Sequence, residues 1–240
     1  TSIVHALGLA AYLWYDDPTT REPFVPLATT FVLAIAFAAI AAIVNTVLAP
    51  GFELFGITGL VLFFFLVVGP IEEFVKWFAI RAYAYRGEAF QTVIDGVVYG
   101  AVAGLGFAAI ENFVYIATVY FEAGAGSDTQ VASAASVTAQ RLFAGPGHVV
   151  FSSWAGFYLG LAKFNPENRG PIVIKGLLIA AFINALSNTK VTVPPSALPL
   201  SIPLIFGLII VYHAAWFGLL YRKIRAYQDL YRRSGSEPDR

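Results

Sequence analysis

The chain has 240 residues, of which 58% are hydrophobic and only 12% are charged. That charged share is about half that of a typical soluble domain, so the composition argues against a soluble globule. The 15 basic and 15 acidic residues cancel, which predicts no nucleic-acid partner, and the absence of cysteine excludes disulfides, zinc-thiolate sites and thiol nucleophiles.

Long uncharged runs dominate the sequence, at residues 24–52, 54–71, 142–162 and 191–221. A helix needs about 20 apolar residues to cross the roughly 30 Å hydrocarbon layer of a bilayer, and these runs reach or approach that length. They predict an all-α, polytopic transmembrane helical bundle in the lipid bilayer. In chain order we expect spans near residues 2–15, 23–48, 53–69, 71–86, 93–121, 147–163, 171–188 and 200–221. Because position 1 is not Met, we expect the numbering to start inside the gene product.

The number of spans depends on Gly69-Pro70. Proline removes a backbone donor, so it can kink one long helix or separate two short ones. The prediction is therefore seven or eight spans, with eight preferred. We expect a single integral membrane domain over 1–240, with a motif-bearing core at 70–188 and a basic cytoplasmic tail at 222–240.

Lysine and arginine in short loops predict the orientation of a membrane protein. Basic residues border two of the predicted loops and fill the C-terminal segment: Arg81, Arg86, Lys163, Arg169, Lys175, Arg222, Lys223, Arg225, Arg232 and Arg233. The intervening loop at 122–140 has two acidic residues and no basic one. We therefore predict a multi-pass protein of the cell membrane with a cytoplasmic C-terminus and an external 122–140 loop. The acidic segment 16–22 is external only if there are eight spans.

Ionisable residues lie within or at the edges of the predicted spans, although a charge at the bilayer centre costs about 2.5–3.5 kcal/mol. They are Glu72, Glu73, Lys76, Asp95, Glu111, His148 and, just before a span, Arg141. With the histidine neutral, four carboxylates and two cations sum to a charge of minus two. In a low dielectric, either shared protons or a bound cation must compensate this excess.

Side chains one helical turn apart recur in four of the predicted spans. The pairs are Glu72 with Lys76, Phe107 with Glu111, His148 with Ser152, and Asn184 with Asn188. We expect these four helix faces to converge on one hydrated cavity. Glycines at four-residue spacing, Gly96, Gly100 and Gly104 in one span and Gly156 and Gly160 in another, predict close approach of two helix backbones.

Three stretches together resemble a known family: Gly69-Pro70-Ile71-Glu72-Glu73-Phe74-Val75-Lys76, Asp95-Gly96 leading to Gly104-Leu105-Gly106-Phe107-Ala108-Ala109-Ile110-Glu111-Asn112, and Pro146-Gly147-His148. In this order they resemble the PrsW family of intramembrane proteases, which cleave anti-sigma factors and are distantly related to CAAX prenyl endopeptidases and bacteriocin-processing membrane enzymes. The resemblance covers roughly residues 70–188. It implies an intramembrane endopeptidase acting on a membrane-anchored protein.

The last motif departs from the family pattern. Where such families place His-x-x-x-Asn or His-x-x-x-Asp, this chain has Asn184-Ala185-Leu186-Ser187-Asn188. If the family histidine contributes to catalysis, Asn184 must substitute for it as a neutral hydrogen-bonding group.

Peptide hydrolysis needs an activated water, a proton donor for the leaving amine and donors for the developing oxyanion. We predict that Glu72 is the general base, that Glu73 or Glu111 completes the carboxylate cluster, and that Lys76 keeps one carboxylate ionised. His148 is expected to orient water or stabilise the oxyanion together with a neutral amide: Asn112, Asn184 or Asn188.

Two variants of this mechanism differ from it in the nucleophile or in the cofactor. Ser152 follows His148 by one turn on the same helix, a poor geometry for a Ser-His dyad, so we assign it a supporting role. A metal-dependent variant would use Glu72, Glu111 and His148 as ligands. Catalytic zinc usually has three protein ligands rich in His, so this set fits an oxygen-preferring ion better, and the cofactor is predicted as none or a divalent metal, zinc or another.

Structural interpretations compete with these roles. Glu72 and Lys76 can form a buried ion pair that fixes helix register, and Asp95 can cap its helix or pair with Arg141.

Two other function classes stay open. One is a proton- or cation-coupled transporter, which also buries carboxylates. The other is a catalytically degenerate binding module, which the Asn184 departure motivates. The sequence predicts no oligomeric state.

Overall fold

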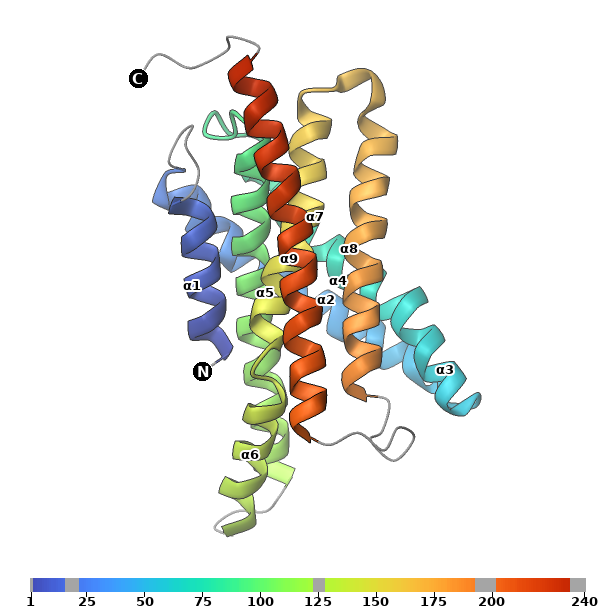
Figure 1. The fold of residues 1–240 in the computed structure, drawn as a ribbon. Helices are drawn as coiled ribbons and strands as arrows, with labels where there is room; N and C mark the ends of the chain where they lie inside the picture. The colour runs from blue at the N-terminus through green and yellow to red at the C-terminus, as the bar shows by residue number, and fades with distance from the viewer. Residues whose placement is uncertain (1, 16–21, 123–127, 193–201, 234–240) are drawn as a thin grey trace.

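The computed structural model describes residues 2–15, 22–122, 128–192 and 202–233, and over these ranges the chain is helical and has no strand (Figure 1). The α-helices are α1 (Ser2–Tyr15), α2 (Phe24–Glu53), α3 (Gly56–Phe63), α4 (Gly69–Ala82), α5 (Val93–Glu122), α6 (Asp128–Gln140), α7 (Ala144–Lys163), α8 (Arg169–Thr192) and α9 (Ile202–Arg233). The predicted all-α class is confirmed.

Several helices have the length and composition of membrane spans. Within the described ranges, five stretches are long and apolar enough to cross a membrane: Phe24–Glu53, Gly56–Arg86, Val93–Glu122, Pro166–Lys190 and Leu204–Leu230. α1 is a shorter apolar helix, and α7 has 20 residues but carries polar side chains inside the bundle. The protein is a multi-pass membrane protein.

The stretch around Gly69-Pro70 is one bent helix. α3 passes into a π-helical segment at Phe64–Val68, and α4 begins directly after it at Gly69. A π-helical segment widens one turn, so the chain bends without a break, and such segments are frequent at functional sites. The missing N–H of Pro70 falls in the first turn of α4, where proline is tolerated. The stretch Gly56–Arg86 is thus one candidate membrane span rather than two, and the count of seven or eight spans stays a prediction.

Figure 1 shows the path of the chain at the turn after α2 and at the two ends of the bundle. α2 and α3 meet in a tight turn at Gly56, whose φ of +57° is a left-handed conformation that suits glycine. The C-terminal end of α1 lies at the same end of the bundle as the C-terminal end of α9 (Figure 1). Residues 16–21, on which the eight-span orientation depended, lie outside the described residues, as do 234–240 of the predicted basic tail.

α5 and α7 form the centre of the bundle through backbone-to-backbone packing. A Cβ atom added at Gly96 would lie 2.3 Å from the carbonyl oxygen of Gly156, and one at Gly100 would lie 2.4 Å from that of Ser152. At Gly104 it would lie 2.3 Å from the carbonyl oxygen of His148. The predicted close approach at the glycines is therefore confirmed, and it draws the middle of α5 against the start of α7.

A second close approach joins α4 to α8. A Cβ atom at Gly69 would lie 2.5 Å from the carbonyl oxygen of Ala181, so a larger residue would push the two helices apart. Burial separates the central helices from the peripheral ones, because 83% of the apolar window of α5 is enclosed by protein, against 11% for α9. The polar residues of α4, α5, α7 and α8 thus meet in the enclosed part of the bundle.

Candidate active site

Four helices contribute polar side chains to one connected cluster. α4 carries Glu72, Glu73 and Lys76, α5 carries Glu111 and Asn112, α7 carries His148 and Ser152, and α8 carries Asn184 and Asn188. The structure brings these nine residues together through hydrogen bonds and ion pairs that join helices far apart in the sequence. The glycine contacts described above explain why the helices come close enough for this.

The innermost part of the cluster is an ion pair between residues of α4 that lie about one helical turn apart. Lys76 Nζ lies 2.5 Å from Glu73 Oε1 and 3.9 Å from Glu72 Oε2. It also lies 3.0 Å from His148 Nδ1 and 4.4 Å from the centre of the Phe107 ring. The side chains of Lys76 and Glu73 are 0% and 1% exposed, so this pair is isolated from water and depends on its neighbours for hydrogen bonds.

Asn184 supplies hydrogen bonds to both α4 carboxylates. Its Nδ2 donates to Glu72 Oε2 at 3.0 Å and to Glu73 Oε1 at 2.8 Å. Asn188 Nδ2 donates to Asn184 Oδ1 at 2.7 Å, which holds the amide of Asn184 in this orientation. A neutral amide has two N–H groups and can therefore bridge two carboxylates without adding charge. Ser152 completes the shell, since its hydroxyl donates to Glu73 Oε2 at 3.2 Å.

The outer edge of the cluster is built on Glu111. His148 Nε2 lies 2.9 Å from Glu111 Oε2, and the Arg141 guanidinium forms an ion pair with the same carboxylate. Arg141 Nε also donates to Asn112 Oδ1 at 2.6 Å, and its guanidinium lies over the Tyr115 ring. The side chains of Glu111 and Arg141 are 19% and 18% exposed. Water or a substrate can therefore reach the cluster most readily from this edge.

Arg141 is the member of the cluster whose partners the sequence did not predict. The sequence counted it among the charged groups near the spans and suggested Asp95 as its partner, whereas its actual partners lie 29 and 30 residues away on α5. Its position directly before the His148 span was the available signal, because an excess of carboxylates in the spans requires a cation nearby.

Asp95, which the sequence offered either as a supporting residue of the site or as a helix cap, does not join the cluster. Its carboxylate accepts hydrogen bonds from the backbone N–H of Gln91 at 2.5 Å and of Thr92 at 2.9 Å, and from the Thr92 hydroxyl. It therefore caps the first turn of α5, about 24 Å along the helix from Glu111. Without Asp95, the cluster holds three carboxylates against Lys76 and Arg141, a sum of minus one rather than minus two with a neutral histidine.

A divalent cation is a chemically reasonable way to balance that excess. One ligand atom each from Glu72, Glu111 and His148 lies within 4.8 Å of the others. Ligands bound about 2.0–2.2 Å from a single ion are at most about 4.4 Å apart, so only a small inward shift is needed. Two carboxylates and one imidazole are a donor set that divalent metals accept. The residues present therefore fit such an ion.

The fold and this cluster define a class of protein, a multi-pass membrane protein with a carboxylate- and histidine-rich site enclosed between its helices. The sequence model described as PrsW family intramembrane metalloprotease matches residues 22–216, most of the chain. The chain belongs to this family.

Relatives named Protease PrsW agree with the family assignment. The chain is 34% identical over 122 residues to a protein named Protease PrsW from Geobacillus kaustophilus, covering 51% of this chain and 48% of the relative. It is 30% identical over 173 residues to a Protease PrsW from Clostridioides difficile, covering 71% and 68%. It is 28% identical over 196 residues to one from Bacillus subtilis, covering 78% and 82%. The chain thus spans about half the length of the Geobacillus relative, and no solved structure matches it.

Proposed function

We propose that this protein is an intramembrane endopeptidase that hydrolyses a peptide bond in a membrane-anchored protein. The observation that supports this most strongly is the cluster itself, in which three carboxylates and a histidine meet beside only two cations. A cluster built only for stability would favour matched charges, because an unbalanced carboxylate in a low dielectric is costly. A site that must accept a proton or bind a cation has a use for the imbalance.

Glu72 is the carboxylate best suited to act as the base. Its ion pair with Lys76 is long, at 3.9 Å, whereas Glu73 and Glu111 each have a close cationic partner. In the proposed reaction, Glu72 takes a proton from water while the water oxygen attacks the peptide carbonyl carbon. The C–N bond then breaks as Glu72 returns the proton to the leaving amine, which gives a carboxylic acid and an amine and regenerates the Glu72 carboxylate.

His148 and Arg141 are the donors placed to stabilise the developing oxyanion. Both contact Glu111 at the edge of the cluster that is partly exposed, so a carbonyl group arriving from that side meets them first. Asn184 and Asn188 hold the α4 carboxylates and each other, which gives them a supporting role. Asn112 supports Arg141 in the same way.

A divalent cation can operate at the same place. Glu72, Glu111 and His148 would hold it, and when bound it would lower the pKa of a bound water and polarise the peptide carbonyl. The imidazole directs Nδ1 at Lys76 and Nε2 at Glu111, so Nε2 is the nitrogen that would face the ion beside Glu111.

The resemblance to the PrsW family implies an anti-sigma factor as the substrate class, and we propose a substrate of that kind with one membrane span. We also propose that the protein lies in the cell membrane with its C-terminus in the cytoplasm. The basic residues support this orientation, because the loops and tail that carry them lie at the end of the bundle where α7 and α9 terminate (Figure 1).

The test is cleavage of a single-span protein substrate by the purified full chain in liposomes. We expect Glu72→Gln to lower the cleavage rate by at least about 10²–10⁴-fold, the usual contribution of a general base, while substrate binding persists. The control is Glu167→Gln, the same chemical change at an exposed carboxylate. Loss of cleavage with a chelator and its return with one divalent metal would identify the cofactor. Undiminished cleavage by Glu72→Gln would end the proposal.

A further inference from the structure

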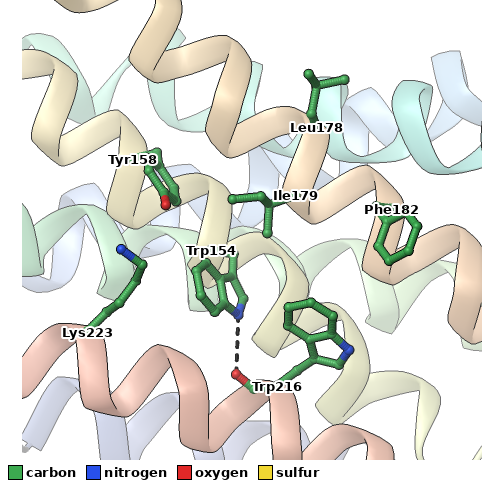
Figure 2. A pocket seen from close by; sticks show the side chains of 7 residues that line it. All are labelled: Trp154, Tyr158, Leu178, Ile179, Phe182, Trp216 and Lys223. Atoms are coloured by element: carbon green, nitrogen blue, oxygen red, sulfur yellow. Dashed lines mark hydrogen bonds between the residues drawn. The ribbon is translucent and has the colours of Figure 1, made fainter.

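A groove that the cluster does not use lies between α7, α8 and α9 (Figure 2). Its cavity volume of about 460 Å³ falls within the range of about 300–1,000 Å³ that is typical of small-molecule sites. Trp154 forms its floor and is 4% exposed, and its indole N–H donates to the carbonyl oxygen of Trp216 at 3.3 Å. Trp154 points about 200° around α7 from Ser152, so the groove and the cluster are on opposite faces of this helix.

One end of the groove is basic. Lys223 is the only charged residue among the seven described residues that line it, and none of the seven is acidic. Lys223 Nζ lies 5.5 Å from the centre of the Tyr158 ring, and Lys175 Nζ reaches the same ring from α8 at 5.7 Å. Figure 2 shows the Lys223 amine and the Tyr158 hydroxyl at one end and Phe182 at the other. Two cations, one from α8 and one from α9, therefore lie near the same aromatic ring.

The backbone makes room for this arrangement. A Cβ atom at Gly176 of α8 would lie 2.4 Å from Tyr158 Cβ, so only glycine lets the tyrosine ring sit this close to α8. Beyond the ring the lining is apolar and open to the surroundings, with Leu178 65% and Phe182 49% exposed. Both residues belong to a membrane-spanning helix, so the opening faces lipid.

We propose that this groove binds a phospholipid with an anionic headgroup. The phosphate would lie between Lys175 and Lys223, and an acyl chain would follow Ile179, Phe182 and Trp216. Basic pockets between spanning helices recognise anionic headgroups in this way. Lys223 lies in the C-terminal third of α9, where Arg222 and Arg225 flank it in the sequence and add positive charge that attracts an anionic lipid.

The groove tryptophans provide a direct measurement. The protein has four tryptophans, so Trp14→Phe and Trp77→Phe leave fluorescence from Trp154 and Trp216 alone. This variant is reconstituted in phosphatidylcholine vesicles that contain a small fraction of brominated phosphatidylglycerol or, in parallel, of brominated phosphatidylcholine. Each basic residue near an anionic headgroup raises the affinity for that lipid by about fivefold. We therefore expect Lys175 and Lys223 to give a binding preference of about 30-fold for the anionic lipid, measured as quenching of the tryptophan fluorescence.

Charge variants then identify the residues responsible. Lys175→Gln with Lys223→Gln should abolish the preference, whereas Arg232→Gln with Arg233→Gln removes the same charge at the exposed end of α9 and should preserve it. Equal quenching by the two brominated lipids in the tryptophan-reduced protein would overturn the proposal. It would mean that the groove holds bulk lipid or a protein helix rather than an anionic lipid. A preference that survives the lysine changes would overturn it too. Neither readout depends on peptidase activity, so the result is independent of the proposed function.

Discussion

The two acidic residues of α5 show how one helix can carry a structural carboxylate and a site carboxylate. Asp95 has donors three and four residues away, from Gln91 and Thr92. Glu111 has partners 30 and 37 residues away, Arg141 and His148. Partners from the same turn can form as soon as the helix forms, whereas distant partners require the whole bundle. The number of residues between a carboxylate and its partners therefore distinguishes a helix cap from a member of the cluster.

The largest expected effect comes from removing each of these two carboxylates in turn. Glu111→Gln should lower peptidase activity by about 10²–10⁴-fold with little change in thermal stability, because it removes the charge that orients His148. Asp95→Ala should do the reverse, lowering the free energy of unfolding by about 0.5–2 kcal/mol as the cap is lost, with activity retained. Cleavage assays and thermal unfolding of both variants test the contrast. An Asp95→Ala protein that folds but is inactive would contradict it.

Much of the fold and of the cluster was predictable from the sequence. Uncharged runs of membrane-spanning length fix the helical class, and the four-residue glycine spacing of Gly96, Gly100 and Gly104 predicts the contact that draws α5 onto α7. The one-turn pairs on four helices predict that their polar faces meet. These features are local, since each depends only on helical periodicity and the length of an apolar run.

The rest depended on contacts that no local pattern encodes. The sequence left Asp95 open between a helix cap, a partner for Arg141 and a supporting role at the site, and the folded chain shows that Gln91 and Thr92 supply its donors. Arg141 joins the cluster because the segment between α6 and α7 folds back over α5. The π-helical segment before Gly69 explains the continuous α3–α4 path, and a Gly-Pro pair alone is equally compatible with a break.

A smaller effect is expected at Asn184, which is a second case of distant partners. Asn184→Leu removes both donors to the α4 carboxylates and should lower activity by about 10–100-fold, the usual cost of losing a supporting hydrogen bond at an active site. Asn184→His restores an N–H donor of the kind that the family pattern places there, and should retain more activity than leucine. The control is Asn165→Ala, whose side chain bonds only to the carbonyl of Leu161 in its own turn. Equal activity of the leucine and wild-type proteins would show that the amide has no part in the reaction.

The smallest effect is expected at two adjacent serines that point to different partners. Ser152 donates to Glu73 at 3.2 Å and Ser153 to the carbonyl oxygen of Val97 at 3.3 Å, and both residues are at most 1% exposed. Because a hydrogen bond is worth about 1 kcal/mol, Ser152→Ala should lower activity by only about fivefold. Ser153→Ala should instead lower stability by a similar free energy and leave the cleavage rate unchanged.

This pair also decides the nature of the nucleophile. A serine that attacked the peptide would be indispensable, so its alanine variant would have no measurable cleavage. Ser152 lies in the shell around Glu73, and its hydroxyl faces that carboxylate rather than either nitrogen of His148, which are directed at Lys76 and Glu111. A histidine engaged in this way cannot take the serine proton. Residual cleavage by Ser152→Ala therefore supports attack by water, and its complete loss in a folded protein would instead require a serine mechanism.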